Sequence, residues 1–532
     1  MTSYRPDVLI VGSGPVGTAL AHQLVMKEGL DVLMIDAGDQ ESTRYGENLR
    51  NAGRYRKEVD PFVNVIKGAL SPVSTFPPPP SFSPFGGGSV TGPGHNPEQN
   101  APTNLRGAAV TRAVGGMGTI WACGVPQFVP EVELTWKGQK YPIDAATLES
   151  QYQKAGDLLG RSLDAFQGSV RHQAAKKTLL AAGHNTVTEL PLAARVTADG
   201  RIVWAGSDTL LGPLSDPAYK PEAGSFTLLP QHLCTKLRVE TDGERWRVAG
   251  VEVSNLADQG EEVDIVAKAY VVAGGAVLTP QLLSASGLEE HLPALGRYLT
   301  DSPVAFCQVV LKKEIIDGLP KLVTEDALTR IQAHQKQHPQ DPLPIPFDDA
   351  PPNLFIPPTE DRPWHAQIQR AAFSHGEVGP QVDDRVVLDL RWYGICRPRE
   401  ENRVSFSSTV KDVYGMPHPT FDFTPSKEDD ANAQAMMNHM TEVANALGGY
   451  LPGSYPQFLD PGTGQQTAGT TRMGTDRQTS VVDSDSRVWA FDNLYLGGNG
   501  LHPFGNASSP TLTSIATALH ATDAINATVK NA

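Results

Sequence analysis

The chain has 532 residues, about twice the size at which one hydrophobic core stops growing, so two or more domains are expected. Hydrophobic residues make up 40% and charged residues 19%, a globular balance that excludes a disordered or fibrous protein. The 44 Lys and Arg residues against 59 Asp and Glu leave a net charge of −15, which disfavours nucleic acid or an anionic membrane as the main partner.

The remaining composition predicts a cytoplasmic location. The four cysteines lie far apart without a C-x-x-C pair, which fits a reducing compartment better than a disulfide framework. No apolar signal region precedes Asp7, and no stretch approaches the roughly 18 apolar residues that a membrane-spanning helix needs. We therefore expect a cytoplasmic protein with neither a membrane nor a nucleic acid as partner.

A dinucleotide-binding motif stands near the start of the chain. Residues 7–11 predict a strand buried on both faces, and residues 18–25 have the apolar spacing of a helix. Between them lies Gly-Ser-Gly-Pro-Val-Gly at 12–17, and a second predicted strand, 31–36, ends in Asp36. Strand, glycine turn, helix and terminal acid together indicate a dinucleotide-binding unit.

The residues of this unit narrow the choice of cofactor. Gly12 makes the tight turn, Gly14 lets the backbone approach a pyrophosphate, and Gly17 permits close contact between helix and strand. The helix N-terminus favours the phosphate charge. Asp36 would accept hydrogen bonds from a ribose, which favours FAD or NAD over NADP. The position of the unit near residue 12 favours FAD.

Two later runs predict further strands of the same parallel sheet. Residues 269–276 and 493–500 are apolar runs that end in glycines, and a helical start at 278–283 follows the first of them. We therefore expect a sheet assembled from segments spread over the whole chain, with a second domain formed by the sequence between them.

An irregular region separates these units. Residues 71–104 are rich in Pro, Gly, Asn and Ser, which is typical of a linker. They lead into 109–123, where Gly115 and Gly116 stand beside Arg112 and a Trp. A Gly-Gly pair in this setting suits backbone that lies against a flat ring, and a glycine-containing hairpin or bulge is the alternative.

Short motifs along the chain carry a family resemblance. They are Asn96-Pro-Glu-Gln99, Val110-Thr-Arg-Ala-Val-Gly-Gly-Met117, Trp364-His-Ala-Gln-Ile-Gln-Arg370, Ala372-Phe-Ser374, Met416-Pro-His-Pro-Thr-Phe-Asp-Phe423, Gly448-Gly-Tyr-Leu-Pro-Gly453, Gly469-Thr-Thr-Arg-Met-Gly474 and Ser509-Pro-Thr-Leu-Thr513. With them the chain resembles the glucose–methanol–choline (GMC) flavin oxidoreductases, in particular the pyranose oxidases of that family. The motifs occur in the family's order and span residues 7 to about 525.

The resemblance implies an α/β fold with two domains. A discontinuous Rossmann-like FAD-binding domain is expected from residues 1–125, 225–300 and 460–532. A substrate-binding domain with a six-stranded mixed β-sheet and helices is expected from 126–224 and 301–459. The implied activity is that of an FAD-dependent oxidoreductase. It would oxidise a secondary hydroxyl of a sugar or glycoside to a ketone by hydride transfer to flavin N5, with O2 or a quinone as acceptor.

The motifs and the resemblance together give a set of expected FAD contacts, drawn from every segment of the first domain. The set is Gly12, Gly14, Pro15, Val16, Gly17, Asp36, Arg112, Gly115, Gly116, Met117, Thr119, Ala122, Cys234, Ala273, Gly274, Asn499, Gly500, Pro510, Thr511 and Leu512.

One departure from the family concerns the attachment of FAD. Fungal members link FAD covalently through a His that stands between the Thr and Trp of the Gly-Gly-Met segment. Here that slot holds Ile120, whose aliphatic side chain cannot form the link. Ala122 likewise replaces a hydroxyl residue that faces the flavin. We therefore expect FAD to be bound non-covalently.

A second departure concerns catalysis. Oxidation of an alcohol needs a base that takes the hydroxyl proton as hydride leaves the carbon. The family uses a His shortly before the 469–474 motif and an Asn directly before Pro510. Those slots hold Gln466 and Ser509 here. Glutamine has no titratable group, so it can orient a hydroxyl but cannot act as the base.

Two other histidines are candidates for a relocated base. His502 lies with Asn506 on a loop, 501–508, that is expected to pass the flavin ring. His375 lies where the family has a mobile substrate loop. The expected catalytic residues are His502, Gln466, Ser509 and Asn506. The expected substrate contacts are Gln367, Arg370, Phe373 and His375.

No metal site is expected. His334 and His338 stand four residues apart, but the run between them offers no acid or cysteine as a third ligand. Residues 327–358 occupy the place of the family's protruding head and oligomerisation arm, and this stretch is shorter than in the family. A monomer and a homo-oligomer therefore both remain open.

Two alternatives accompany the sugar-oxidase hypothesis. One is a C-glycoside oxidase of the same family, which the shortened head would favour by opening the site. The other is a flavin-binding homologue that no longer oxidises alcohols, which Gln466 and Ser509 bring into view. The sugar or glycoside and the carbon oxidised stay open.

Overall fold

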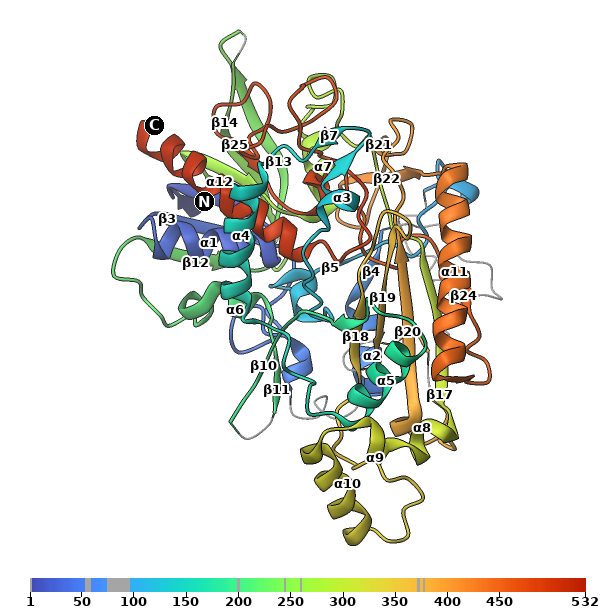
Figure 1. Cartoon of the computed structure of the whole chain (residues 1–532). Helices are drawn as coiled ribbons and strands as arrows, with labels where there is room; N and C mark the ends of the chain where they lie inside the picture. Colours follow the sequence, from blue (N-terminus) through green and yellow to red (C-terminus); the bar gives the residue numbers. More distant parts are fainter. Residues whose placement is uncertain are drawn as a thin grey trace.

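The computed structural model describes residues 2–52, 59–73, 96–198, 201–243, 245–258, 261–370, 374–376 and 378–532. The parallel sheet lies toward the upper left of Figure 1 and the long antiparallel sheet toward the lower right. The helices are α1 (Pro15–Met26), α2 (Val59–Ala69), α3 (Pro130–Glu133), α4 (Ala145–Leu159), α5 (Val170–Ala181), α6 (Ser207–Leu211), α7 (Gly275–Ala285), α8 (Lys313–Asp317), α9 (Leu319–Leu322), α10 (Glu325–Gln337), α11 (Lys427–Leu447) and α12 (Thr511–Asn531).

The N-terminal motif builds a five-stranded parallel sheet. Its order is β12 (Ser225–Leu229), β3 (Asp31–Ile35), β2 (Val8–Val11), β16 (Ala269–Val272) and β25 (Leu494–Leu496). All four pairings are parallel. The prediction of a sheet assembled from distant segments is therefore confirmed.

Burial on two faces explains why the central strands are continuous apolar runs. Val8, Leu9 and Ile10 of β2 have no exposed surface. Helices α1 and α12 pack against each other beside this sheet, and α7 follows β16 directly, so helices cover the strands as in other parallel sheets.

A seven-stranded sheet forms the second layer. Its path is β23 (Gly448–Tyr450), β17 (Val304–Leu311), β20 (Val387–Gly394), β19 (Trp364–Gln369), β18 (Asn353–Ile356) and β9 (Thr188–Glu189), with β24 (Gln457–Phe458) also on β17. The expected combination of helices with two sheets is confirmed. The expectation of six strands in mixed directions is wrong in detail, because every described pairing in this sheet is antiparallel. Short connections such as the one between β18 and β19 favour antiparallel neighbours.

The two faces of this sheet differ in chemistry. Alternate residues of a strand point to opposite faces, so Leu388, Leu390 and Trp392 join an apolar core that α11 and α5 cover. Arg391 and Tyr393 then point the other way, toward the parallel sheet and the cavity described below. One face of the sheet supports the fold and the other is free for a site.

Smaller sheets complete the fold. A four-stranded sheet has the order β1 (Thr2–Tyr4), β15 (Glu262–Ile265), β14 (Trp246–Asn255) and β13 (His232–Thr241), and a three-stranded sheet has β11 (Ile202–Trp204), β10 (Leu192–Val196) and β8 (Arg161–Ser162). The two-stranded pairs are β21 (Arg403–Lys411) with β22 (Pro417–Asp422), β4 (Leu70–Pro72) with β5 (Ala109–Thr111), and β6 (Thr135–Trp136) with β7 (Gln139–Lys140).

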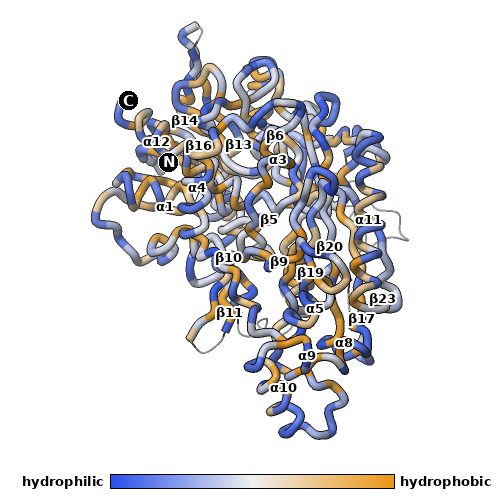
Figure 2. The backbone as a smooth tube through the Cα atoms, in the orientation of Figure 1, coloured by the Kyte–Doolittle hydropathy of each residue, from blue (hydrophilic) through white to orange (hydrophobic). Residues whose placement is uncertain are grey.

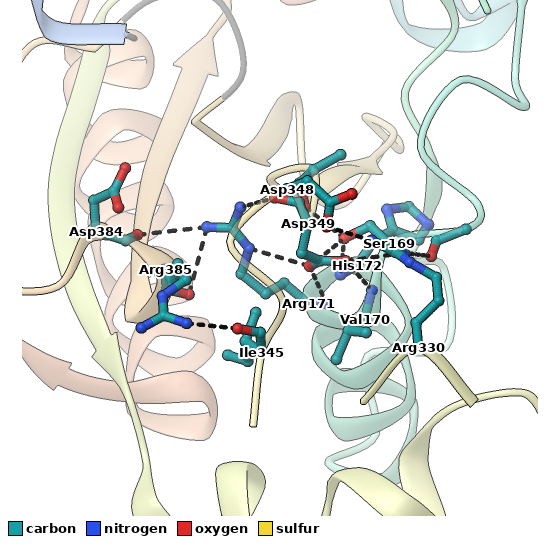
Figure 3. Close-up of polar contacts among 12 residues, drawn as sticks. Ser169, Val170, Arg171, His172, Arg330, Ile345, Asp348, Asp349, Asp384 and Arg385 are labelled. Atoms are coloured by element: carbon teal, nitrogen blue, oxygen red, sulfur yellow. Dashed lines mark hydrogen bonds and ion pairs between the residues drawn. The ribbon is translucent and has the colours of Figure 1, made fainter. Parts of the chain in front are cut away.

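Helices α8 to α10 form a lobe at the lower end of the molecule, and the α10 end carries mostly hydrophilic residues (Figures 1 and 2). Apolar residues of the lobe join the core beside α5, and buried Asp349 adds polar contacts at the start of α5 (Figure 3). Its carboxylate accepts hydrogen bonds from Ser169 Oγ at 3.1 Å and from Val170 N at 2.8 Å. It also accepts from Arg171 Nε and from Arg330 Nη1 of α10, each at 3.3 Å.

The expected division into domains stays a proposal. Each strand of the parallel sheet lies in a segment assigned to the first domain, and each strand of the seven-stranded sheet lies in a segment assigned to the second. Helices α4 and α6 were expected in the second domain, yet they pack on α12 and α1 respectively. Among the described helices, none has the length and apolar character that a membrane span requires.

Candidate active site

A cavity of about 1470 Å³ joins the glycine turn after β2 to the polar face of the seven-stranded sheet. Gly12, Gly14 and Asp36 line one part of it, and Gln367 and Tyr393 line another. Pockets for a single small ligand occupy roughly 300–1000 Å³. The cavity is therefore large enough for a dinucleotide together with a second molecule.

The glycine turn has no room for side chains at two of its positions. Gly12 has φ +105°, and a Cβ there would lie 2.6 Å from the carbonyl oxygen of Ala273. A Cβ at Gly17 would lie 2.1 Å from the carbonyl oxygen of Gly12. The contact of Gly12 with Ala273 brings the two βα turns, after β2 and after β16, against each other, while that of Gly17 closes the first turn on itself. The backbone at this end fits the pyrophosphate of a dinucleotide at the N-terminus of α1.

Asp36 closes the turn from the second strand. Its carboxylate accepts hydrogen bonds from Ser13 N at 2.8 Å, Ser13 Oγ at 2.6 Å and Gly38 N at 2.7 Å. Burial raises the pKa of Asp36, and the bonds from Ser13 oppose that rise. Arg112 lines the cavity nearby, with its guanidinium carbon 3.9 Å from the centre of the Tyr414 ring.

The Gly115-Gly116 pair packs on this turn. Gly115 N donates to Ser13 Oγ, and Ser207 Oγ donates to the Gly115 carbonyl, each at 2.8 Å. Gly115 is therefore held by the protein, while Gly116 and Met117 face the cavity. Of the pair, Gly116 is the one whose backbone could lie against a ring.

Most of the expected FAD contacts line the cavity. Those that do are Gly12, Gly14, Pro15, Val16, Asp36, Arg112, Gly116, Met117, Ala122, Cys234, Ala273, Gly274, Asn499, Pro510 and Thr511. Those that do not are Gly17, Gly115, Thr119, Gly500 and Leu512. The second group supports the wall from behind: Thr119 Oγ1, for example, donates to the Gly116 carbonyl at 2.9 Å.

The two positions near the flavin that depart from the family, 120 and 122, also lie on the cavity wall. Ile120 lines the cavity and packs against Phe62 and Ile66, and Ala122 lines it two residues on. Neither side chain carries a nucleophilic atom.

Gln466, Ser509 and Gln367 all line the cavity. Ser302 Oγ lies 2.9 Å from both Gln466 Oε1 and the carbonyl of Asn506, which stands three residues before Ser509. A Cβ built on Gly124 would lie 3.7 Å from Ser509 Oγ and 3.8 Å from Gln367 Nε2, so these two side chains flank the same glycine. Gln466 Oε1 accepts a hydrogen bond from Ser302 Oγ at 2.9 Å, which fixes the amide. The group can hold hydroxyls but contains no base.

The position of His502 does not support its expected role as the base. Its ring is buried and is not part of the cavity wall. Nδ1 lies 3.0 Å from the Tyr141 hydroxyl and Nε2 lies 2.8 Å from the Ser514 hydroxyl, so both nitrogens are occupied. Burial lowers the pKa of His502 to about 3. His502 is a structural histidine of the core.

Asn506 is likewise part of the loop structure. Its Nδ2 donates to the Ser508 carbonyl at 2.9 Å, and it does not line the cavity. The loop itself is anchored by buried Glu133, which accepts from Ala507 N at 2.9 Å and from Ser508 N at 2.7 Å. These bonds fix the backbone directly before Ser509.

The expected substrate contacts divide in the same way. Gln367 and His375 line the cavity, whereas Arg370 lies behind it with Nη1 3.6 Å from Asp389. Burial, together with the charges of Arg391 and Lys67, lowers the pKa of His375 to about 3. Phe373 lies outside the described residues.

The polar sheet face contributes residues that the sequence interpretation missed. Arg391 and Tyr393 of β20 line the cavity, and the Tyr393 ring stacks on His365 with centroids 4.7 Å apart. The signal was present in Asp389-Leu-Arg391-Trp-Tyr393, where polar and apolar residues alternate inside an otherwise apolar run.

No group of three or more His, Cys, Asp and Glu suited to a metal ion occurs within the described ranges. His334 instead places Nε2 2.8 Å from Asp341, which also binds Arg385.

Comparisons with known proteins identify the family. Two family models, each described as GMC oxidoreductase, match residues 217–304 and 398–518. The chain is 41% identical to pyranose 2-oxidase of Tricholoma matsutake, over 98% of this chain and 94% of that one. It is 29% identical to C-glycoside 3-oxidase of Microbacterium trichothecenolyticum, over 98% of this chain and 97% of that one.

Solved structures resemble the fold. A formate oxidase structure superposes with a TM-score of 0.65 at 13% identity, covering 100% of both chains. Pyridoxine 4-oxidase from Mesorbium loti gives a TM-score of 0.60 at 16% identity, covering 97% of this chain and 98% of that one. At these identities the likeness concerns the fold alone.

Proposed function

The chain belongs to the GMC oxidoreductase family and is an FAD-dependent enzyme, and from this premise we propose that it oxidises a secondary hydroxyl of a sugar or glycoside to a ketone. The observation that carries the proposal is the continuity of the cavity. It joins the dinucleotide turn to a wall of amide and hydroxyl side chains, which are groups that bind sugar hydroxyls. The relatives named pyranose 2-oxidase and C-glycoside 3-oxidase support the same substrate class.

The chain's own residues would hold FAD without a covalent bond. The turn at Gly12 and Gly14 would bind the pyrophosphate, Asp36 the ribose, and the backbone at Gly116 the flavin. Bound FAD supplies the acceptor for hydride and passes the electrons to O2 or a quinone. Ile120 provides no atom for a link, so denatured protein should release yellow flavin into the supernatant. Colour kept in the precipitate would contradict non-covalent binding.

The amide and hydroxyl groups would orient the substrate. Gln466, held by Ser302, can donate from its Nε2 to a sugar oxygen, and Ser509 can exchange hydrogen bonds with a hydroxyl. Gln367 accepts from Gln369 at 2.7 Å and has its Nε2 2.9 Å from His365, so the second N–H of its amide is the group that can reach a substrate oxygen. These groups position the reacting carbon but leave the hydroxyl proton in place. These three side chains therefore support binding and orientation of the substrate rather than its deprotonation.

We propose His375 as the group that takes the proton. Of the two described imidazoles on the cavity wall, His232 lies beside the dinucleotide turn, where its backbone N donates to the Asp36 carbonyl. His375 lies at the polar sheet, against the Phe306 ring. A base with a pKa of about 3 accepts a proton weakly, so slow flavin reduction is expected. His375→Gln should slow anaerobic flavin bleaching, and an unchanged rate would exclude His375.

A glycoside is the second candidate substrate, favoured by the mouth of the cavity. Val413 and Phe458 line it while 67% and 45% exposed, which offers an apolar surface to an aglycone. Anaerobic bleaching with matched free sugars and glycosides separates the candidates. Bleaching of the flavin by glycosides but not by free sugars selects a glycoside oxidase. If no free sugar, charged sugar or glycoside bleaches the flavin, the protein is a homologue that has lost alcohol oxidation.

The four cysteines are buried and unpaired, which supports the reducing cytoplasm as the proposed location.

A further inference from the structure

One charged side chain of the cavity wall has no partner within the protein. Arg391 is 1% exposed and lines the cavity. It lies opposite Gln367 on β19 and opposite Phe306 on β17. Within the described part of the chain, no hydrogen bond or ion pair reaches its guanidinium, and its Nε and Nη2 are sealed from solvent without a hydrogen-bond partner. Only Nη1 remains to face the cavity.

The acids near Arg391 do not bond its guanidinium. Asp389 lies two residues away on the same sheet face and feels the charge of Arg391. Its Oδ1 accepts from Gln308 at 2.8 Å and lies 3.6 Å from Arg370, while its Oδ2 is buried without a hydrogen-bond partner among the described residues. On the described cavity wall, carboxylates occur at Asp36 and Asp460. Asp36 is bonded within the dinucleotide turn, and Asp460 is exposed.

Other cations lie near Arg391. Arg370 Nη1 is 3.6 Å from Asp389, and the charges of Arg391 and Lys67 both act on His375. A buried cation without a partner is unfavourable, because the protein does not replace the hydrogen bonds that water would make. An anionic group of a ligand would supply what the protein leaves out, through charge-assisted hydrogen bonds to the guanidinium.

We infer that the substrate is an anionic sugar, whose carboxylate or phosphate group binds Arg391 while its hydroxyls bind Gln367, Gln466 and Ser509. The inference rests on the proposed function, since it names the sugar class for the same site. Gln367 ties the two parts together, because it lies opposite Arg391 and flanks Gly124 with Ser509. A hexose bearing an acidic group would thus place its hydroxyls at Gln466 and Ser509 while its charged group binds Arg391 on β20.

Titration of the FAD-loaded enzyme under nitrogen tests this inference. The probes are glucose, glucuronate and glucose 6-phosphate, with binding followed by calorimetry and reduction by loss of flavin absorbance. We expect one or both anionic probes to bind roughly 10- to 100-fold more tightly than glucose, and the comparison between them separates carboxylate from phosphate. Arg391→Gln should remove this preference and leave the affinity for glucose within about threefold. Arg391→Lys should restore part of it.

Arg195→Gln is the matched control, since Arg195 is an exposed arginine of β10. Equal binding of the three probes, or an anion preference that survives in Arg391→Gln, would overturn the inference. Equal loss of glucose and anion affinity in Arg391→Gln would also overturn it, because the arginine would then act on the sugar ring. If Arg391→Gln does not fold, the affinities of the three probes for the wild type and for Arg391→Lys still test the inference.

The two proposals fail in different ways. Bleaching by glucose without any anion preference removes the anion inference and keeps the oxidase. Tight anion binding without bleaching by any sugar removes the oxidase and keeps an anion site.

Discussion

Arg171, at the start of α5, and Arg391, on β20, are buried arginines 5% and 1% exposed. Arg171 donates to the Asp349 carboxylate through Nε and to the Asp384 and Arg385 carbonyls through Nη1, as Figure 3 shows. Arg391 has no such partner among the described residues. The two side chains are buried to nearly the same extent, but Arg171 is hydrogen-bonded by the protein and Arg391 is not.

The presence or absence of protein partners separates buried polar groups that stabilise the fold from buried polar groups that can bind a ligand. A buried charge surrounded by donors and acceptors of its own chain is part of the structure, and removing a partner destabilises it. A buried charge that faces a cavity without a partner costs the fold stability, and its unused hydrogen-bonding capacity is available to a ligand. His502 belongs with Arg171 in this respect, because both of its ring nitrogens have partners within the protein.

The largest stability effect is expected at Asp349. Asp349→Ala leaves Arg171 as an uncompensated buried charge and removes the cap of α5, so the free energy of unfolding should fall by about 3–5 kcal/mol. Urea unfolding followed by tryptophan fluorescence measures it. Asp348→Ala is the matched control: this neighbour is 83% exposed, pairs with Arg330 at 3.4 Å, and should cost under about 1 kcal/mol. A similar loss of unfolding free energy in Asp349→Ala and Asp348→Ala would show that the buried contacts of Asp349 do not stabilise the fold.

The largest effect on rate is expected from restoring a base at the open end of the cavity. The double variant Gln466→His with Ser509→Asn places an imidazole beside the orienting amides, and anaerobic flavin reduction should accelerate by about 10²–10⁴-fold. The added rate should rise with pH through about 6.5, since the neutral imidazole is the base. Gln466→Met with Ser509→Asn is the control without a titratable group. Equal rates in the two double variants would show that proton removal does not limit reduction.

The sequence revealed the dinucleotide end of the molecule because its signals are local. Gly12, Gly17 and Asp36 lie within one βαβ unit, and the structure brings them together as their spacing predicts. The role of His502 could not be found in this way. Its partner Tyr141 is 361 residues away in sequence, and only tertiary packing shows that both ring nitrogens are occupied.

The polar sheet face was missed for a related reason. Strand alternation in β20 places Arg391 on one face, but a periodic pattern does not say which face meets a cavity. That depends on the antiparallel register with β17 and β19 and on the apolar cover that α11 gives to the other face. The register sets Gln367 opposite Arg391, a pairing of distant segments that no local motif contains.

A moderate, pH-dependent effect is expected at His502. Its pKa is about 3 in the folded protein, below the ordinary value near 6.5, so the unfolded chain takes up a proton first as pH falls. Its stabilisation is complete above about pH 6.5 and is lost toward pH 3, by about 1.4 kcal/mol per pH unit. His502→Gln should flatten the unfolding free energy between pH 4 and 6 by about this slope. The exposed control His338→Gln should leave the slope unchanged. Equal slopes in His502→Gln and the wild type would contradict the lowered pKa of His502 in the folded protein.

The smallest effect sharpens the comparison most. Arg391→Met replaces the guanidinium by an apolar chain and breaks no hydrogen bond within the described protein, so the free energy of unfolding should change by under about 1 kcal/mol or increase. Arg171→Met makes the same chemical change where the charge is bonded. It should cost about 3–5 kcal/mol, because the Asp349 carboxylate and the Asp384 and Arg385 carbonyls all lose this donor. Thermal unfolding of the two FAD-loaded variants measures the pair. A loss at Arg391 as large as that at Arg171 would mean that its charge is already compensated within the protein, and the argument for an anionic ligand would fall with it.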